Sequence, residues 1–445
     1  MKKLALGLAI ALLNPWASAE SLSTGTPSYL FQIHGSNTIG AELGPALVKA
    51  YLAKRGCNSV TTEQLGSYDL ALKCKDNEDK QFAVRIVSKG SNTGFKAMDR
   101  GDADIVASSR AVKPKEIKLL SSLGDITAQT SEIVVALDAV VIIVNPNNPV
   151  NSLTINEIAR IFKGQYGNWS RIGKGNGPIR ILARDESSGT RDTFDNLVLG
   201  KGVQIYNRHM SYISNEALSE EVSSNKNAIG FCSYSTIEES KAISVAMAGG
   251  AAIYPDSVNI STEDYPLSRR LYFYMPEGIE NPDAKDFLEF VKTDSAQQVV
   301  EQSGFIPVNV QILDGRDTYA SGRYARAIRG YQRLSINIRF SMGGTSIDNF
   351  GHQSVLRLAR FMEENRGNLL LLGFYGLSEG KNDKRFSAEK ARKVSEALIE
   401  AGVRKSKIII RGLGDERLLS SGVKASDNRK NIRIEVWFKP WFSGQ

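Results

Sequence analysis

The stretch Arg184-Asp185-Glu186-Ser187-Ser188-Gly189-Thr190 places an arginine, a run of hydroxyl side chains and a glycine within one short segment. An apolar, strand-like run over 179–182 precedes it, and a helix-like run over 194–198 follows. The pattern predicts a strand–turn–helix unit with Ser188, Gly189 and Thr190 at the helix N-terminus, where free N–H groups and the helix dipole attract an anion. Arg184 can add two charge-assisted hydrogen bonds to a tetrahedral oxyanion. The alternative is that Ser187 or Ser188 only caps the helix.

Three further turns repeat this arrangement nearer the N-terminus. Strand candidates at 29–33, 83–87 and 104–107 are each followed by a cluster of Gly, Ser, Thr or Asn, namely 35–40, 90–94 and 108–110. Such residues are also ordinary turn and cap residues, so one cluster alone indicates little. In open α/β sheets, however, ligands gather at the carboxyl ends of strands. Four such turns in one α/β module therefore predict a shared ligand site.

Composition and the N-terminus indicate an exported protein. The chain has 445 residues, enough for two or three domains, with 42% hydrophobic and 23% charged residues. A basic start, an apolar run over 4–13 and the small residues Ala17-Ser18-Ala19 predict a secretory signal peptide at residues 1–19, cut before Glu20. No later apolar run reaches the roughly 20 residues of a membrane span. We expect a periplasmic, outer-membrane-associated, cell-wall-associated or secreted protein.

Cysteine and histidine usage argues against metal chemistry. Cys57 and Cys74 flank a short polar segment and fit a disulfide in an oxidising compartment, whereas Cys232 lies in an apolar run typical of a buried thiol. The three histidines are scattered. We find no phosphate loop, no dinucleotide turn and no nucleophile–base pair. The sequence therefore predicts a binding protein and not an enzyme, with no cofactor, metal or nucleic-acid partner.

Charge divides the chain in two. Residues 20–310 carry a net charge of −5 and residues 311–445 one of +11. The change of sign predicts a first domain at 20–310, a basic linker at 311–331, a second domain at 332–440 and a tail at 441–445. The linker is expected to be partly helical around residues 324–328, and its arginines form either a docking strip or a solvated face. The aromatic residues after Trp437 either pack against the last strand or form a partner surface.

Residues 25–310 resemble a phosphate-type substrate-binding protein of ABC importers. The matching motifs are the 35–39, 90–94 and 103–110 turns, the 184–190 stretch, the segment from Leu153 to Trp169, and the runs 228–231 and 304–308. The resemblance implies an α/β fold of the two-lobed, type II periplasmic-binding-protein ("Venus flytrap") class, which closes by a hinge around its ligand. An ABC permease is the partner that such a protein would serve, and whether one receives the ligand here is left open by the sequence.

The same resemblance implies a set of oxyanion ligands. Ser36, Thr38, the Ile39 backbone, Asn92 and Ser109 would hold inorganic phosphate from one lobe, and Arg184, Ser188, Gly189 and Thr190 from the other. The chain departs from the family at Ser109, where some phosphate binders have an aspartate that accepts the ligand's own proton. The resemblance therefore implies either a different way of discriminating among oxyanions or another acceptor.

Residues 332–440 resemble the α+β OmpA-like domain that associates with peptidoglycan. The resemblance is carried by 383–391, Gly402-Val403, 412–416 and the closing motif 431–435. The family grips peptidoglycan with an aspartate and an arginine, but this chain has Gly376 and Lys390 at those positions. Lys390 can pair with a carboxylate without the bidentate geometry of arginine. Cell-wall binding and a fold kept only for docking or dimerisation both remain open.

These observations predict a periplasmic phosphate or oxyanion receptor joined to an envelope-associating domain, serving phosphate uptake or sensing. The rivals are an envelope structural or interaction protein with a vestigial ligand site and a phosphate-ester hydrolase.

Overall fold

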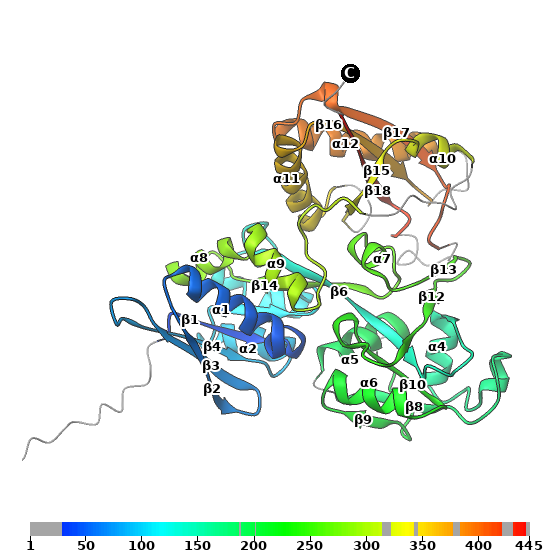
Figure 1. Ribbon diagram of the computed structural model, residues 1–445, viewed down its shortest axis with the longest axis horizontal. Helices are drawn as coiled ribbons and strands as arrows, with labels where there is room; N and C mark the ends of the chain where they lie inside the picture. The colour runs from blue at the N-terminus through cyan, green and yellow to red at the C-terminus, as the bar shows by residue number, and fades with distance from the viewer. Residues whose placement is uncertain are drawn as a thin grey trace, which may run out of the picture.

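The computed structural model (Figure 1) describes residues 29–186, 188–200, 202–313, 322–341, 346–376, 383–420 and 430–441. The expected signal peptide, Ser187 and the last four residues of the tail lie outside this range. Two lobes form the first part of the chain, and a smaller domain lies beyond the region that joins them.

The first lobe is a mixed sheet covered by helices. Its strand order is β2-β3-β4-β1-β5-β14-β6, and β1 pairs in parallel with β4 and β5. Because helices cover the sheet, the strands are largely apolar. The elements are β1 Phe31–Gly35, β2 Val60–Gly66, β3 Asp69–Lys75, β4 Gln81–Val87, β5 Ile105–Ser108, β14 Ser268–Tyr274, α1 Gly44–Lys54, α2 Ser91–Asp99, α3 Pro114–Leu119, α8 Pro282–Phe290 and α9 Asp294–Gln302.

The long strand β6 belongs to the sheets of both lobes. β6 spans Glu132–Val144, and all its residues after the first are buried. Its first part, up to Ala139, pairs with β14, and its second part pairs with β10 of the other lobe. β6 is therefore the structural axis of a hinge.

The second lobe continues the strand order as β6-β10-β8-β9. A small sheet, β13-β12-β7, lies beside it. The elements are β7 Ser152–Thr154, β8 Arg180–Arg184, β9 Met210–Tyr212, β10 Ala228–Ser233, β11 Lys241–Ala242, β12 Ser244–Ala246, β13 Ala252–Ile253, α4 Ile155–Phe162, α5 Gly189–Phe194, α6 Asn215–Ser224 and α7 Ser257–Ser261.

The second domain is a four-stranded sheet with helices on both faces. The order β15-β18-β16-β17 includes one parallel pair, β16 with β17. The side chains of β16 alternate, so that Leu369 and Leu371 pack with α11 and α12, whereas Leu370 and Leu372 pack with α10. The elements are α10 Gly322–Ile328, β15 Gln332–Arg339, α11 Asn349–Glu364, β16 Gly367–Phe374, α12 Asp383–Glu400, β17 Ile408–Gly414 and β18 Arg433–Pro440. The predicted fold class, a two-lobed α/β unit followed by an α+β domain, is confirmed.

The segment predicted as a basic linker is partly a structural element. Tyr324, Ala327 and Ile328 are buried against the sheet of the second domain together with Trp437. Their spacing places them on one face of α10. The helix expected around 324–328 is thus present, and its apolar face packs on the second domain. Trp437 lies in β18, as predicted, whereas Trp441 is 53% exposed.

Candidate functional site

Turns from both lobes meet at one point. Ser36 follows the end of β1, Ser109 follows the end of β5, and the turn after β8 leads into α5 at Gly189. Since β1 and β5 are parallel neighbours, their carboxyl ends lie at the same edge of the sheet. Thr38 Oγ1 of the first lobe lies 3.5 Å from Thr190 Oγ1 of the second, although 152 positions separate them in the chain.

Gly189 allows the two lobes to approach this closely. A Cβ at this position would lie 2.3 Å from Ser109 Oγ and 3.5 Å from Ser36 Oγ. Any larger residue would push the turns apart. Ser36 Oγ is fully buried and has no hydrogen-bond partner among the described residues. A buried hydroxyl without a partner costs free energy, so a ligand that pairs with it is favoured.

The structure divides the other predicted ligands of the first lobe. Ile39 is buried in the core of the first lobe, which leaves only its backbone for a ligand. The side chain of Asn92 is exposed and accepts a hydrogen bond of 2.6 Å from Arg110 Nη2, so it is not part of the cluster. Its neighbour Ser91 takes that place, because Ser91 Oγ lies 3.5 Å from Ser109 Oγ and accepts from Ser109 N–H at 3.2 Å. Successive side chains of a helix are rotated by about 100° around its axis, so Ser91 faces the cluster and Asn92 does not.

Ser188 caps α5, as the alternative in the sequence allowed. Its Oγ accepts a hydrogen bond of 3.3 Å from Arg191 N–H. The cap occupies one lone pair of a hydroxyl whose proton stays free to donate. Capping and anion binding are thus compatible at this residue.

Arg184 lines the cleft but does not reach the hydroxyl cluster. Its guanidinium donates to Ile213 O at 2.6 Å, to Tyr212 O at 3.3 Å and to the side chain of Asn215. Only Asp185, at 3.8 Å, offers it a carboxylate among the described contacts. Burial lowers the pKa of Arg184. Because Arg184 donates mainly to neutral oxygens, its positive charge still creates a positive potential at the cleft wall.

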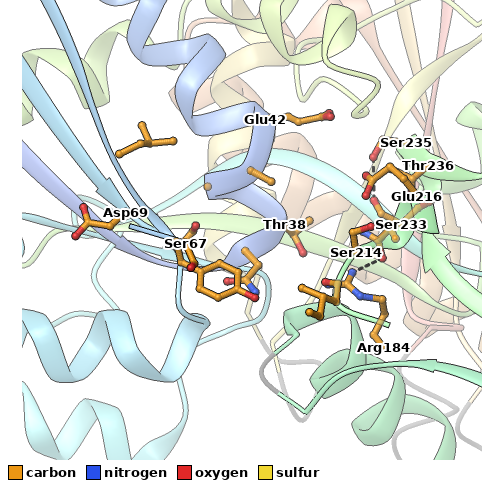
Figure 2. Close-up of a pocket in the computed structure, with 18 of the residues that line it drawn as sticks. Thr38, Glu42, Ser67, Asp69, Arg184, Ser214, Glu216, Ser233, Ser235 and Thr236 are labelled. Carbon is orange, nitrogen blue, oxygen red and sulfur yellow. Dashed lines mark hydrogen bonds between the residues drawn. The ribbon is translucent and has the colours of Figure 1, made fainter. Parts of the chain in front are cut away.

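A cavity of about 310 Å³ opens between the lobes at this wall. Figure 2 shows Thr38, Glu42, Ser67 and Asp69 on one side and Arg184, Ser214, Glu216 and Ser233 on the other. Burial, and then the nearby Glu216, raises the pKa of Glu42. The cavity gives the cluster a polar entrance that crosses from lobe to lobe.

Sequence reasoning missed the arginine nearest the cluster. Arg269, on β14, is 5% exposed and pairs with Asp138 of β6 at 2.6 Å. It also donates to Gly189 O at 3.2 Å, to Thr190 Oγ1 at 3.1 Å and to Thr38 Oγ1 at 3.4 Å. Because Arg269 donates to both threonine oxygens and the contact between the two hydroxyls uses at most one of their protons, at least one proton is available to an anion. The sequence signal for this pair was Asp138, a single carboxylate within an otherwise apolar run, because a buried charge needs a partner.

Asp138 is fully engaged by the protein. Its Oδ1 accepts from Ser233 Oγ at 2.8 Å and from Ala139 N–H at 2.7 Å, while its Oδ2 accepts from Arg269. The buried pair therefore adds little net charge to the cluster, which offers mainly hydroxyl and amide donors.

In the second domain, Gly376 supplies no carboxylate at the position where the resemblance places an aspartate. A Cβ at Gly376 would lie 2.4 Å from a methyl carbon of Leu418, so a side chain there would require the leucine to shift. Lys390 Nζ lies 5.2 Å from the ring centre of Phe340, and burial lowers the pKa of this lysine.

The remaining structural expectations concern cysteines, metals and membranes. Cys57 and Cys74 form a disulfide with 5.9 Å between their Cα atoms, and Cys232 is a buried free thiol. Among the described residues, no three His, Cys, Asp or Glu side chains are grouped to hold a metal ion. Within the same residues, no helix combines the length and apolarity required to cross a membrane.

Comparison with known proteins identifies both parts of the chain. Residues 58–295 match the model of a PBP superfamily domain, and residues 339–432 match that of the OmpA family. Protein SphX of Synechococcus elongatus is 31% identical over 242 residues, covering 52% of this chain and 70% of its own. The phosphate-binding protein PstS of Pseudomonas aeruginosa is 28% identical over 254 residues, covering 52% and 76%.

A crystal structure of an ABC-type phosphate transport receptor from Vibrio cholerae is 26% identical and covers 62% of this chain and 99% of its own, with a TM-score of 0.49. The matched PBP model covers more than half of the chain. The chain belongs to the PBP superfamily and carries an OmpA domain at its C-terminus.

Proposed function

We propose that this protein captures inorganic phosphate, or a closely related oxyanion, between its two lobes in the cell envelope. The observation that carries the proposal is the contact of Thr38 with Thr190 across the lobes, beside the unpartnered hydroxyl of Ser36. An anion entering there would replace hydroxyl contacts that now join the lobes directly. Relatives named as phosphate-binding proteins support phosphate as the ligand.

The binding free energy would come from short-range hydrogen bonds and dipoles. Ser36, Thr38, Ser109 and Thr190 supply hydroxyl donors, and the N-terminus of α5 supplies amide donors. Arg184 contributes a positive field from the cleft wall. The negative charge of the first domain does not oppose binding, because buried donors act at contact distance. No chemical step is required of the site, and we propose that it binds without catalysis.

We propose that the OmpA domain keeps the receptor near the envelope, for phosphate uptake or sensing. Gly376 and Leu418 argue against the family's carboxylate-based grip on peptidoglycan. Wall association would then use other surfaces of the domain. Transfer of the ligand to an ABC permease is part of the same proposal and rests on the relatives alone.

Titration calorimetry on the full chain tests the binding proposal. We expect one phosphate per chain, with a parallel sulfate titration to show how the site with Ser109 discriminates. Thr190→Val keeps the shape of the side chain and removes its hydroxyl, which should weaken phosphate binding by about 1.5–3 kcal/mol. Thr130→Val, at an exposed position of the first lobe that bonds Glu277, is the matched control. Equal affinities of the two variants would contradict the proposal.

A further inference from the structure

The OmpA domain is docked on the strands that join the lobes. In Figure 1 this domain lies beside β6 and β14, and α11 points toward them. Gln353 Nε2 of α11 donates to Glu132 O, at the start of β6, at 2.8 Å. Asn349 Nδ2 donates to Thr127 O at 2.6 Å. The contact is thus made at the strands that join the lobes, and it extends to the second lobe, where Ser420 Oγ donates to Ala248 O at 3.3 Å.

A network of buried ion pairs extends this contact to β14 and to residues 262–264, which precede β14 in the chain. Arg339 of β15 donates to Thr262 O and to Asp264 Oδ1, both at 2.9 Å. Arg270 of β14 pairs with Glu263 at 2.7 Å and with Asp348 of the OmpA domain at 2.9 Å. The Arg270 guanidinium also stacks on Phe350, with 4.6 Å to the ring centre. Domains within a chain usually move relative to one another unless their interface is extensive, and these contacts hold the OmpA domain on the hinge.

Arg269, the residue before Arg270 on β14, lies in the anion cluster. Arg269 bridges Thr38 of the first lobe and Thr190 of the second, while Arg270 faces Asp348. Successive side chains of a strand point to opposite faces of the sheet. One strand therefore carries the interlobe contact on one face and the interdomain contact on the other.

We propose that Arg270 and Asp348 form a positioning pair for the anion site. The OmpA domain holds β14 through this pair, so that Arg269 stays in place between the two lobes. Docking of the OmpA domain and closure of the lobes on the anion then reinforce each other. The inference rests on the proposed function and adds a role for the OmpA domain in it.

Thermodynamic linkage makes the coupling reciprocal. If docking strengthens anion binding by some factor, anion binding must strengthen docking by the same factor.

Asp348→Asn isolates the pair within the full chain. Asp348 Oδ1 caps α11 by accepting from Gly351 N–H at 2.7 Å, and asparagine caps a helix equally well, so the substitution removes the charge and keeps the helix. We expect the phosphate Kd to rise about fivefold, in the usual range of coupling between sites. Glu396→Gln, exposed on α12, is the matched control and should leave the Kd unchanged.

Gln353→Ala, which loosens the same interface at β6, should also raise the Kd. Hydrogen exchange supplies the reciprocal readout: saturating phosphate should slow exchange of the β15 amides in the wild-type chain and slow it less in Asp348→Asn. Suppose that the wild-type chain binds phosphate and that Asp348→Asn and Gln353→Ala bind it with the same Kd as Glu396→Gln. This result would overturn the inference and leave the proposed function standing. A wild-type chain that binds no phosphate would overturn the proposed function, and this inference with it.

Discussion

The interlobe cleft and the surroundings of Gly376 in the OmpA domain differ in what they offer a ligand. In the cleft, hydroxyl groups from distant turns converge, and Ser36 Oγ has no hydrogen-bond partner among the described residues. In the OmpA domain, Gly376 supplies no carboxylate, and the methyl end of Leu418 lies beside it. Membership in a family is thus accompanied by a set of converging donors in one region and by the lack of an expected side chain in the other. A fold carries no function by itself, because function depends on the particular residues of the site.

The largest expected effect comes from Asp138→Asn in the cleft. Removing the charge leaves the buried guanidinium of Arg269 without its counter-ion. Breaking one side of a buried pair costs about 3–5 kcal/mol. Denaturant unfolding should show this loss, whereas Glu289→Gln, which breaks an exposed pair with Lys292, should cost at most about 1 kcal/mol. A comparable small loss for both variants would show that the pair beside the cleft is not a structural requirement.

The stabilising effect of the interface between the first domain and the OmpA domain should depend on pH. Burial alone would raise the pKa of Glu263, but the nearby Arg270, Arg339 and Lys430 hold it at about 2. A carboxyl whose pKa is lower in the folded state stabilises that state above its unfolded value of 4.5, and this contribution is lost as pH falls from there toward 2. Unfolding free energies should fall across this window, and less steeply in Glu263→Gln. If the unfolding free energies of the wild type and of Glu263→Gln fall equally with pH, Glu263 does not stabilise this interface.

The cleft cation should contribute next. Arg184→Met keeps most of the side-chain volume and removes the positive field, which should weaken phosphate binding by less than the about 1.5–3 kcal/mol of a direct charged hydrogen bond. Arg180→Met, on the same strand but partly exposed, is the control. Calorimetry separates the two, and unchanged affinity in Arg184→Met would remove this residue from the site.

The smallest effect is expected in the OmpA domain. Lys390 lies over the ring of Phe340, and Gly376 supplies no carboxylate to act with it, so Lys390→Ala should not change how much full-length protein sediments with purified sacculi. A clear loss of sedimentation would show that the second site retains a peptidoglycan grip after all, and the contrast between the two regions would then disappear.

The sequence predicted features that local patterns encode. The turns after β1, β5 and β8 follow from strand–turn–helix patterns, and their proximity follows from strands that end at a common edge. It did not predict the Arg269–Asp138 pair, because each residue lies inside a strand and only tertiary pairing of β14 with β6 brings them together. Asn92 lies outside the hydroxyl cluster and its neighbour Ser91 lies in it, because helical rotation decides which of two polar residues faces the cluster. The sequence indicated a helix around 324–328, but its packing on the sheet of the OmpA domain depends on tertiary contacts.

A crystal structure of the full chain grown with phosphate tests the central claim most directly. We predict a tetrahedral anion between the lobes, within hydrogen-bond distance of the hydroxyls of Thr38 and Thr190. An anion found only on the OmpA domain or on the outer surface, with those two threonines still in direct contact, would contradict it.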